Sequence, residues 1–226
     1  MNILAIDLSM SATGLAMISF DDLELGFEWS KLPGSCRLVW ECPEFRYHGA
    51  LIKRTSEDFV GKIDDMLLPI LEWAMHANQV IIEGYAFATN MAYARANTEL
   101  GGVVRYQLRK IGQTPLEISP SSLKKFLAGH GFAKKEQMLE QVQRLGVPIT
   151  DHNMADAFGL AYLGYALQLP DSAYLEYDKE KRETIRAIKY PVRKEKRKKK
   201  SAPDPEAILR ANAANRTRAG KVKLLW

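Results

Sequence analysis

Residues 79–84 constrain the fold most strongly, because their sequence Gln-Val-Ile-Ile-Glu-Gly is apolar at every interior position before the glutamate. Successive side chains of a strand point to opposite faces, so Val80 and Ile82 would cover one face and Ile81 the other. A strand that is apolar on both faces belongs inside a sheet that carries helices on both sides. The run ends in the carboxylate of Glu83. The sequence therefore predicts an α/β domain with a charged group at one edge of its sheet.

The patterns on either side of this run supply the other elements of such a domain. Apolar segments bounded by turn residues indicate strands, and apolar residues at three- and four-residue steps indicate helices. The predicted strands are 3–6, 14–20, 37–40, 79–84 and 115–118, and the predicted helices are 55–77, 92–110, 134–145 and 153–167. Ser119 and Pro120 are expected to begin one further helix. Residues 21–50 are interpreted as a long hairpin or insertion around the strand 37–40.

Charge is distributed unevenly along the chain. The net charge of the 226 residues is +5, but residues 179–226 hold 17 Lys and Arg against 5 Asp and Glu and so carry +12, which leaves −7 for the rest. A basic arm on an acidic body is typical of a protein that meets a polyanion, because lysine and arginine displace counterions from phosphates. We expect a folded domain over residues 1–170 and a basic, flexible tail over 171–226 that contacts nucleic acid.

Three acidic residues stand where the fold itself does not require a charge. Asp7 ends the first strand, Glu83 ends the apolar strand, and Asp156 lies among alanines in the last predicted core helix. Each has a structural alternative, as a turn residue, a surface strand end or a charge near a helix terminus. If the two strands are neighbours, the carboxylates meet and repel one another unless cations bind. Magnesium suits such oxygen ligands, and two ions would activate a water and stabilise the leaving oxygen in phosphodiester cleavage.

Four segments together resemble a known family. Residues 6–9 and 13–16 are similar to its first strand and turn, 80–85 to its second catalytic strand, 123–125 with 129–137 to its lysine-bearing DNA-contact segment, and 153–157 to its final acidic helix. The family is that of the RuvC-like Holliday junction resolvases, of the compact kind often found in phages, within the RNase H-like nuclease superfamily. The resemblance covers residues 1–168 in the family's own order.

The resemblance implies a mixed central sheet of the RNase H-like fold, flanked by helices. It implies a structure-selective endonuclease of DNA recombination and repair, a crossover junction endodeoxyribonuclease that hydrolyses phosphodiesters of four-way junctions and other branched DNA. The expected products are 5′-phosphate and 3′-hydroxyl ends. Two symmetric nicks in a two-fold symmetric junction call for a homodimer. The implied cofactor is Mg²⁺, two ions per active site, with Mn²⁺ as a substitute, and no nucleotide cofactor is expected.

The same resemblance assigns roles to individual residues. It makes Asp7, Glu83 and Asp156 catalytic metal ligands and Lys135 a catalytic lysine. The family usually places a second acid or a histidine three residues before the last aspartate, where this chain has Asn153. A fourth metal ligand could therefore come from Asn153, from Asp151 or from His152, and Asp151 could equally be the N-cap of the helix.

DNA contacts are expected from several parts of the chain. The aromatic residues after Glu83 are one part: a ring at Phe87 would stack on an unpaired base, while Tyr85 is expected to pack beneath the loop. Lysine side chains are expected to hold phosphates by their charge. Exposed lysines without such a function are also common. The full set of predicted contacts is Ser9, Tyr85, Phe87, Lys124, Lys125, Lys134, Lys135, Arg193, Lys194, Lys196, Arg197, Lys198, Lys199 and Lys200.

Cellular location and competing functions complete the expectations. No run approaches the roughly 18 apolar residues of a membrane span, and residues 1–10 lack the features of a signal peptide. We expect a cytoplasmic protein, in the bacterial host cell if phage-encoded, although the basic run could also be a nuclear localisation signal. A non-catalytic DNA-binding protein on the same scaffold is one alternative function. An actin-like ATPase is another, but it requires a second, similar lobe for which this chain has no internal repeat.

Overall fold

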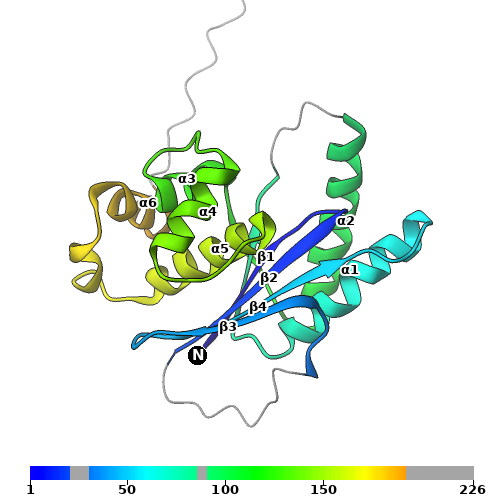
Figure 1. The fold of residues 1–226 in the computed structure, drawn as a ribbon. Helices are drawn as coiled ribbons and strands as arrows, with labels where there is room; N and C mark the ends of the chain where they lie inside the picture. The colour runs from blue at the N-terminus through cyan, green and yellow to red at the C-terminus, as the bar shows by residue number, and fades with distance from the viewer. Residues whose placement is uncertain (21–30, 86–90, 192–226) are drawn as a thin grey trace, which may run out of the picture. The chain divides into compact units, whose positions relative to one another are not determined.

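The computed structural model describes residues 1–20, 31–85 and 91–191. Six strands form one mixed sheet in the order β3-β4-β2-β1-β5-β6 (Figure 1). The strands are β1 (Asn2–Asp7), β2 (Ala12–Ser19), β3 (Ser35–Glu41), β4 (Arg46–Lys53), β5 (Gln79–Glu83) and β6 (Leu116–Ile118). The β1, β2, β3 and β4 pairings are antiparallel, whereas β5 pairs in parallel with both β1 and β6. The predicted α/β class and the mixed sheet are confirmed.

The segment interpreted as a hairpin or insertion around one strand contains an additional sheet strand. β4 pairs with β2 along its whole length and joins β3 to the sheet. The sequence does not reveal β4 because Gly49 interrupts its pattern, and glycine is depleted in strands. The structure explains this glycine: a Cβ atom at Gly49 would lie 1.9 Å from the hydroxyl oxygen of Tyr47, whose side chain occupies that space. A strand-interior glycine here marks a close approach.

Helices cover both faces of the sheet, as the apolar β5 run predicts. One face packs against α1 (Phe59–Ala74) and α2 (Met91–Lys110) through a buried cluster that includes Ile6, Leu15, Ile70 and Leu108. On the opposite face lie α3 (Pro120–Ala128), α4 (Lys135–Arg144) and α5 (His152–Gln168). Among the residues that the structure describes, no helix is both long enough and apolar enough to cross a membrane.

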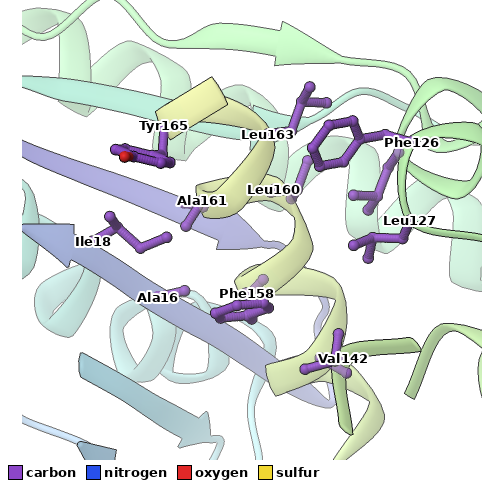
Figure 2. Close-up of a cluster of buried hydrophobic side chains, with 14 of the residues drawn as sticks. Ala16, Ile18, Phe126, Leu127, Val142, Phe158, Leu160, Ala161, Leu163 and Tyr165 are labelled. Carbon is purple, nitrogen blue, oxygen red and sulfur yellow. The ribbon is translucent and has the colours of Figure 1, made fainter. Parts of the chain in front are cut away.

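α5 lies closest to the sheet because its inner face carries small residues. A Cβ atom on Gly164 would be 2.2 Å from Cδ1 of Ile81, so the helix backbone sits directly on β5. Ala161 lies near Ile18 of β2 (Figure 2). Phe158 packs edge-on against Tyr47, with 5.1 Å between the ring centroids. This seating fixes the height and rotation of α5 over β1, β2 and β5.

The folded unit continues past residue 170, where the sequence analysis places its end. Residues 1–190 form one compact unit that includes η2 (Ala173–Glu176) and α6 (Lys179–Lys189). α6 lies beside α3 (Figure 1) and buries Ile185 completely. The domain boundary of 170 was wrong because most α6 residues are charged or polar, and only one narrow face, around Ile185, packs against the core.

Candidate active site

Two of the three predicted carboxylates leave the sheet side by side. β1 and β5 are parallel and hydrogen-bonded, and the register pairs Ile6 with Ile82. Asp7 and Glu83 are the next residues of the two strands, so they emerge at the same edge of the sheet. Asp7 is only 7% exposed. The condition on which the cluster depends, that the two strands are neighbours, is met.

Helix α5 brings the third carboxylate to this edge. Asp7 pairs with Gly14 across β1 and β2, and Gly14 lies directly under the first turn of α5. A Cβ atom on Gly14 would be 2.2 Å from the carbonyl oxygen of Asn153 and 3.2 Å from Cβ of Ala157. Asp156 precedes Ala157 and is half-buried. The three carboxylates, far apart in sequence, therefore belong to one electrostatic cluster.

The pKa values of the three acids show how strongly they interact. Burial, followed by the charges of Glu83 and Asp156, raises the pKa of Asp7 well above its usual value. Burial and the charge of Asp156 raise the pKa of Glu83 to about 7, and burial also raises the pKa of Asp156. No hydrogen bond within the described residues stabilises these carboxylates in their charged form. The site accumulates negative charge that an additional cation would neutralise.

Two lysines provide the positive charge around the cluster. Lys135 lowers the pKa of all three carboxyl groups, and Lys124 lowers those of Glu83 and Asp156. Lys124 lies on α3, and Lys135 is the first residue of α4. Burial outweighs both lysines, because the net pKa shift of each acid remains upward. The lysines predicted to contact phosphate thus face the carboxylates without cancelling their charge.

The three candidates for a fourth metal ligand, Asp151, His152 and Asn153, make different contacts in the structure. Asp151 is the N-cap of α5, where its Oδ1 accepts hydrogen bonds from the backbone N–H groups of Asn153 (2.8 Å) and Met154 (3.0 Å). Its charge still raises the pKa of Asp7. Asn153 donates its side-chain N–H to the carbonyl oxygen of Ala12 at 3.1 Å and so fastens α5 to β2. The Nδ1 atom of His152 is buried and makes no hydrogen bond within the described residues.

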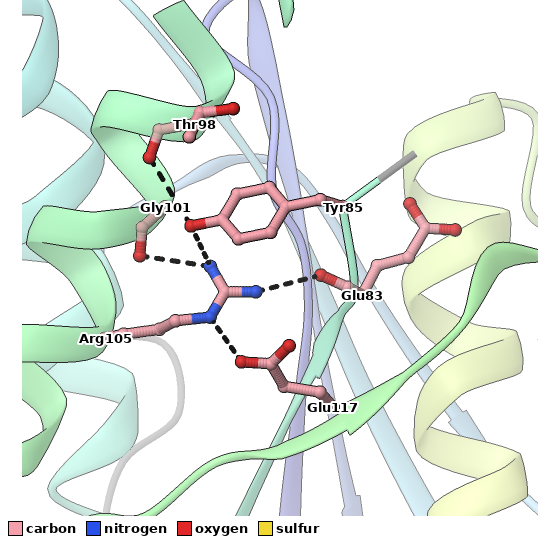
Figure 3. A network of polar contacts seen from close by, with 6 residues as sticks. All are labelled: Glu83, Tyr85, Thr98, Gly101, Arg105 and Glu117. Carbon is pink, nitrogen blue, oxygen red and sulfur yellow. Dashed lines mark hydrogen bonds and ion pairs between the residues drawn. The ribbon is translucent and has the colours of Figure 1, made fainter. Parts of the chain in front are cut away.

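A polar network that the sequence analysis missed supports Glu83 from the side of α2 (Figure 3). Arg105 donates hydrogen bonds to Glu117 (2.7 Å), to the hydroxyl of Tyr85 (3.1 Å), to the carbonyl oxygen of Gly101 (3.1 Å) and to that of Glu83 (3.5 Å). Its guanidinium also lies over the Tyr85 ring, 4.4 Å from the centroid. Arg105 thereby ties the chain on both sides of Gly84 to α2. Because Arg105 lies on a polar face of α2, the local sequence did not indicate that it contacts Glu83.

The remaining predicted DNA contacts lie in different environments. Ser9 is 7% exposed and its hydroxyl lies 2.9 Å from that of Ser11, so it shapes the β1–β2 turn, and its contact with DNA stays a prediction. Lys125 is half-buried and pairs with Glu183 of α6 at 2.6 Å. Lys134 is exposed at the start of α4. Phe87 and the basic residues of 193–200 lie outside the described residues.

The donor chemistry of the cluster fits a hard divalent cation such as Mg²⁺. Buried carboxylates with raised pKa values are the oxygen ligands that such ions take. As the side chains lie, no three His, Cys, Asp or Glu residues in the described part of the chain already form a complete metal-ligand group. The three carboxylates thus lie close enough to interact electrostatically, but their oxygen atoms are not arranged around a common metal position.

Comparisons with known proteins agree with this geometry. A crossover junction endodeoxyribonuclease RuvC of Rickettsia typhi is 26% identical over 166 residues, which cover 72% of this chain and 95% of that protein. A RuvC of a Synechococcus species is 27% identical over 168 residues, 73% of this chain and 98% of its own length. No protein-family model matches the chain.

Solved structures show the same fold. Thermus thermophilus RuvC has a TM-score of 0.52 and 23% identity, covering 71% of this chain and 91% of its own. The same protein in complex with a Holliday junction substrate also has a TM-score of 0.52, at 22% identity, covering 71% of this chain and 90% of its own. The matched sequence runs over most of both chains. The chain therefore shares the fold of the Thermus thermophilus RuvC structures and is similar in sequence to RuvC proteins over most of its length.

Proposed function

We propose that the chain is a metal-dependent endonuclease that resolves four-way DNA junctions and cuts other branched DNA. The observation that carries the proposal is the cluster of Asp7, Glu83 and Asp156 beside two lysines: burial raises the pKa of all three acids, and neighbouring acids raise those of Asp7 and Glu83 further. A protein gains nothing in stability from such a cluster, since buried like charges destabilise the fold. The names of the curated relatives, crossover junction endodeoxyribonuclease, support the same reaction.

Each residue of the cluster has a distinct task in this proposal. Asp7, Glu83 and Asp156 hold Mg²⁺ or Mn²⁺, with Asp151 or Asn153 completing the ligand set. Two ions held there would supply activation of the attacking water and stabilisation of the leaving oxygen. Lys124 and Lys135 position the scissile phosphate by charge, without reading the base sequence. Hydrolysis leaves a 5′-phosphate and a 3′-hydroxyl.

The proposed assembly is a homodimer that presents two sites to one junction. A four-way junction has two-fold symmetry, so paired nicks at symmetric positions require two equivalent sites. The structure of Thermus thermophilus RuvC with a Holliday junction substrate supports branched DNA as the ligand class. The basic run 193–200 adds sequence-independent attraction to phosphates.

A cleavage panel tests the function. Four-way, Y-shaped, flap and linear duplex DNA, each labelled on one strand at a time, are incubated with the full chain and Mg²⁺, and the cuts are mapped. Paired symmetric nicks in the four-way substrate are the expected result, and Asp156→Asn should remove them. A wild-type protein that leaves all substrates intact with both Mg²⁺ and Mn²⁺ would overturn the proposal.

One observation favours a second candidate, a non-catalytic protein that binds branched DNA. Asn153 uses its amide to hold α5 on β2 and brings no charge to the site. Metal binding at that position would then be weaker than with a carboxylate. Junction binding by the wild type, unchanged by divalent ions and without any nicking, would select this alternative.

A further inference from the structure

Phe132 is the most exposed large apolar side chain in the part of the chain that the structure describes, with 94% of its surface open to solvent. It lies in the short connection between α3 and α4. Isolated apolar side chains on a surface are common and most of them are partly covered by neighbours. A phenylalanine ring exposed on nearly its whole surface buries almost no apolar area and so does not stabilise the fold. The residues around it indicate what else it contacts.

The backbone on both sides of Phe132 is held in place. Ala133, the next residue, is 1% exposed and belongs to the core. A Cβ atom on Gly131, the preceding residue, would lie 3.3 Å from the carbonyl oxygen of Ser121. Gly129 ends α3 with a φ of 81° and donates its N–H to the carbonyl oxygen of Lys125 at 3.0 Å. The ring therefore points outward from a fixed loop.

The same loop joins the two helices that carry the site's lysines. Lys135, three residues after Phe132, lowers the pKa of Asp7, Glu83 and Asp156 by its charge, and Lys124 on α3 lowers two of these pKa values. Lys134 is exposed at the start of α4. An exposed ring between phosphate-attracting charges is the arrangement by which proteins hold unpaired strands, because every base has a face on which a ring can stack.

We propose that Phe132 stacks on an unpaired nucleobase of branched DNA, next to the strand whose phosphate the lysines hold. The proposal rests on the proposed function, which places DNA at these lysines. It assigns the α3–α4 loop a base contact of its own, separate from the aromatic residues that follow Glu83. Loss of one stacked base is expected to weaken binding about 10-fold.

The test uses the full chain and four variants. Phe132→Ala removes the ring, Phe132→Leu keeps apolar bulk, and Phe132→Trp keeps an aromatic face. Phe59→Ala is the matched control, because Phe59 is also exposed but begins α1 on the other face of the sheet. Binding is measured without divalent ions on a four-way junction, a Y-shaped DNA and a linear duplex that carry the fluorescent base 2-aminopurine at successive positions around the branch.

Stacking predicts a position-specific result. Wild type and Phe132→Trp should quench 2-aminopurine at one position beside the branch, whereas Phe132→Ala and Phe132→Leu should lose the quenching and about 10-fold in affinity for branched DNA. Binding to linear duplex should be the same for all variants. The proposal is overturned if Phe132→Ala matches Phe59→Ala on every substrate.

The two proposals fail in distinguishable ways. Wild-type nicking of junctions with Mg²⁺, together with an unchanged Phe132→Ala, removes only the role of Phe132. A wild type that shows the quenching but no cleavage supports the stacking and removes the nuclease. A wild type that binds no branched DNA removes both.

Discussion

Asn153 and Gly14 are in direct backbone contact, so that a single added Cβ atom on Gly14 would lie 2.2 Å from the Asn153 carbonyl oxygen. The side chain of Asn153 reinforces this contact through its 3.1 Å hydrogen bond to the carbonyl oxygen of Ala12. An aspartate at this position has no N–H to donate to that oxygen. The departure from the family's usual acid therefore has a structural purpose, which is to hold α5, and with it Asp156, against β2.

Gly14→Ala is expected to slow cleavage about 100-fold while leaving a folded protein. The methyl group must push the first turn of α5 away from β2, and a displacement of about 1 Å near the reacting groups costs about 100-fold in rate. Single-turnover cleavage of a four-way junction measures the loss, and circular dichroism checks the fold. Gly102→Ala is the control, because a Cβ atom there meets nothing within 4 Å. Equal rates for Gly14→Ala and the wild type would contradict this reading of the contact.

Asp7→Asn is expected to remove cleavage, to leave junction binding in place and to stabilise the metal-free protein. The pKa of Asp7 is raised by burial and by Glu83 and Asp156, so the ionised form costs stability at a pH above the folded pKa and the neutral amide avoids that cost. We expect the free energy of unfolding at pH 8 to rise. Mg²⁺ should raise the Tm of the wild type but not of the variant.

Asp64→Asn is the matched control for the Asp7 experiment. Asp64 is exposed on α1, so the same chemical change should alter neither cleavage nor the response to Mg²⁺. Thermal unfolding with and without the metal compares the two variants. A destabilised Asp7→Asn protein in metal-free buffer would show that the acidic cluster does not strain the fold.

Arg105→Met is expected to raise the Mg²⁺ concentration needed for half-maximal cleavage. The substitution removes the ion pair to Glu117 and the hydrogen bonds to Tyr85 and the Glu83 carbonyl oxygen, so Glu83 loses its lateral support. Groups that orient a metal ligand typically contribute 10- to 100-fold in metal affinity or activity. Junction binding without metal should change little.

Arg95→Met separates this effect from the loss of any arginine on α2. Arg95 pairs with Glu99 on the same helix, but its side chain is 82% exposed, and such surface pairs contribute little. Titrations of cleavage rate against Mg²⁺ are compared for the two variants. Parallel shifts in both would mean that Arg105 does not act through Glu83.

The protein should lose stability in mild acid through His48 of β4. Burial, with a smaller effect of Arg46, lowers the pKa of His48 from 6.5 to about 4. The folded state therefore favours the neutral ring, so this stability is complete above pH 6.5 and is lost as the pH falls toward 4. Urea unfolding at pH 7, 6, 5 and 4 should show a steeper decline in the wild type than in His48→Gln, by about 2 kcal/mol over this range. If the free energy of unfolding fell equally with pH in the wild type and in His48→Gln, His48 would not be the source of the acid sensitivity.

Removal of residues 191–226 should weaken DNA binding without loosening the fold. The compact unit ends at Tyr190, and residues 193–200 carry seven Lys and Arg against one Glu. Junction affinity should fall at moderate salt, and the slope of log Kd against log salt should flatten, with cleavage retained at low salt. An unchanged salt slope would show that these residues do not lie on phosphates.

A longer truncation provides the contrast for the tail. Removal of residues 179–226 also deletes α6, with its buried Ile185 and the ion pair between Lys125 and Glu183. That protein should have a lower Tm than the one that ends at Tyr190. The pair of truncations therefore separates the electrostatic contribution of the tail from the packing of α6 on α3.

The sequence was most informative where one local pattern determined the outcome. The apolar run before Glu83 predicted a strand covered on both faces, and Ser119 caps α3 as expected, its Oγ accepting from the N–H of Ser122 at 3.1 Å. The three acids were recognisable because each ends or interrupts an apolar pattern. The pattern alone left open whether Asp7 and Glu83 lie on adjacent strands, and the register shows that they do.

The features that sequence reasoning missed depend on contacts between distant residues. Arg105 meets Glu117 and Glu83 only after α2 has packed beside β5 and β6. β4 tolerates Gly49 because the Tyr47 side chain occupies its space. α6 is held by one apolar face and by Glu183, whose partner is 58 residues away. None of these partners can be recognised from periodicity or spacing.

The packing of α5 on the sheet also determines when, during synthesis of the chain, the three acids can come together. A nascent chain that has emerged only as far as residue 150 contains both strand-end acids, but it lacks α5 with Asp156. Domains fold as units during synthesis, and the segment that completes the proposed site is among the last of the core to leave the ribosome. In the proposed nuclease, the three-acid site would therefore be complete only after α5 has left the ribosome and packed on the sheet.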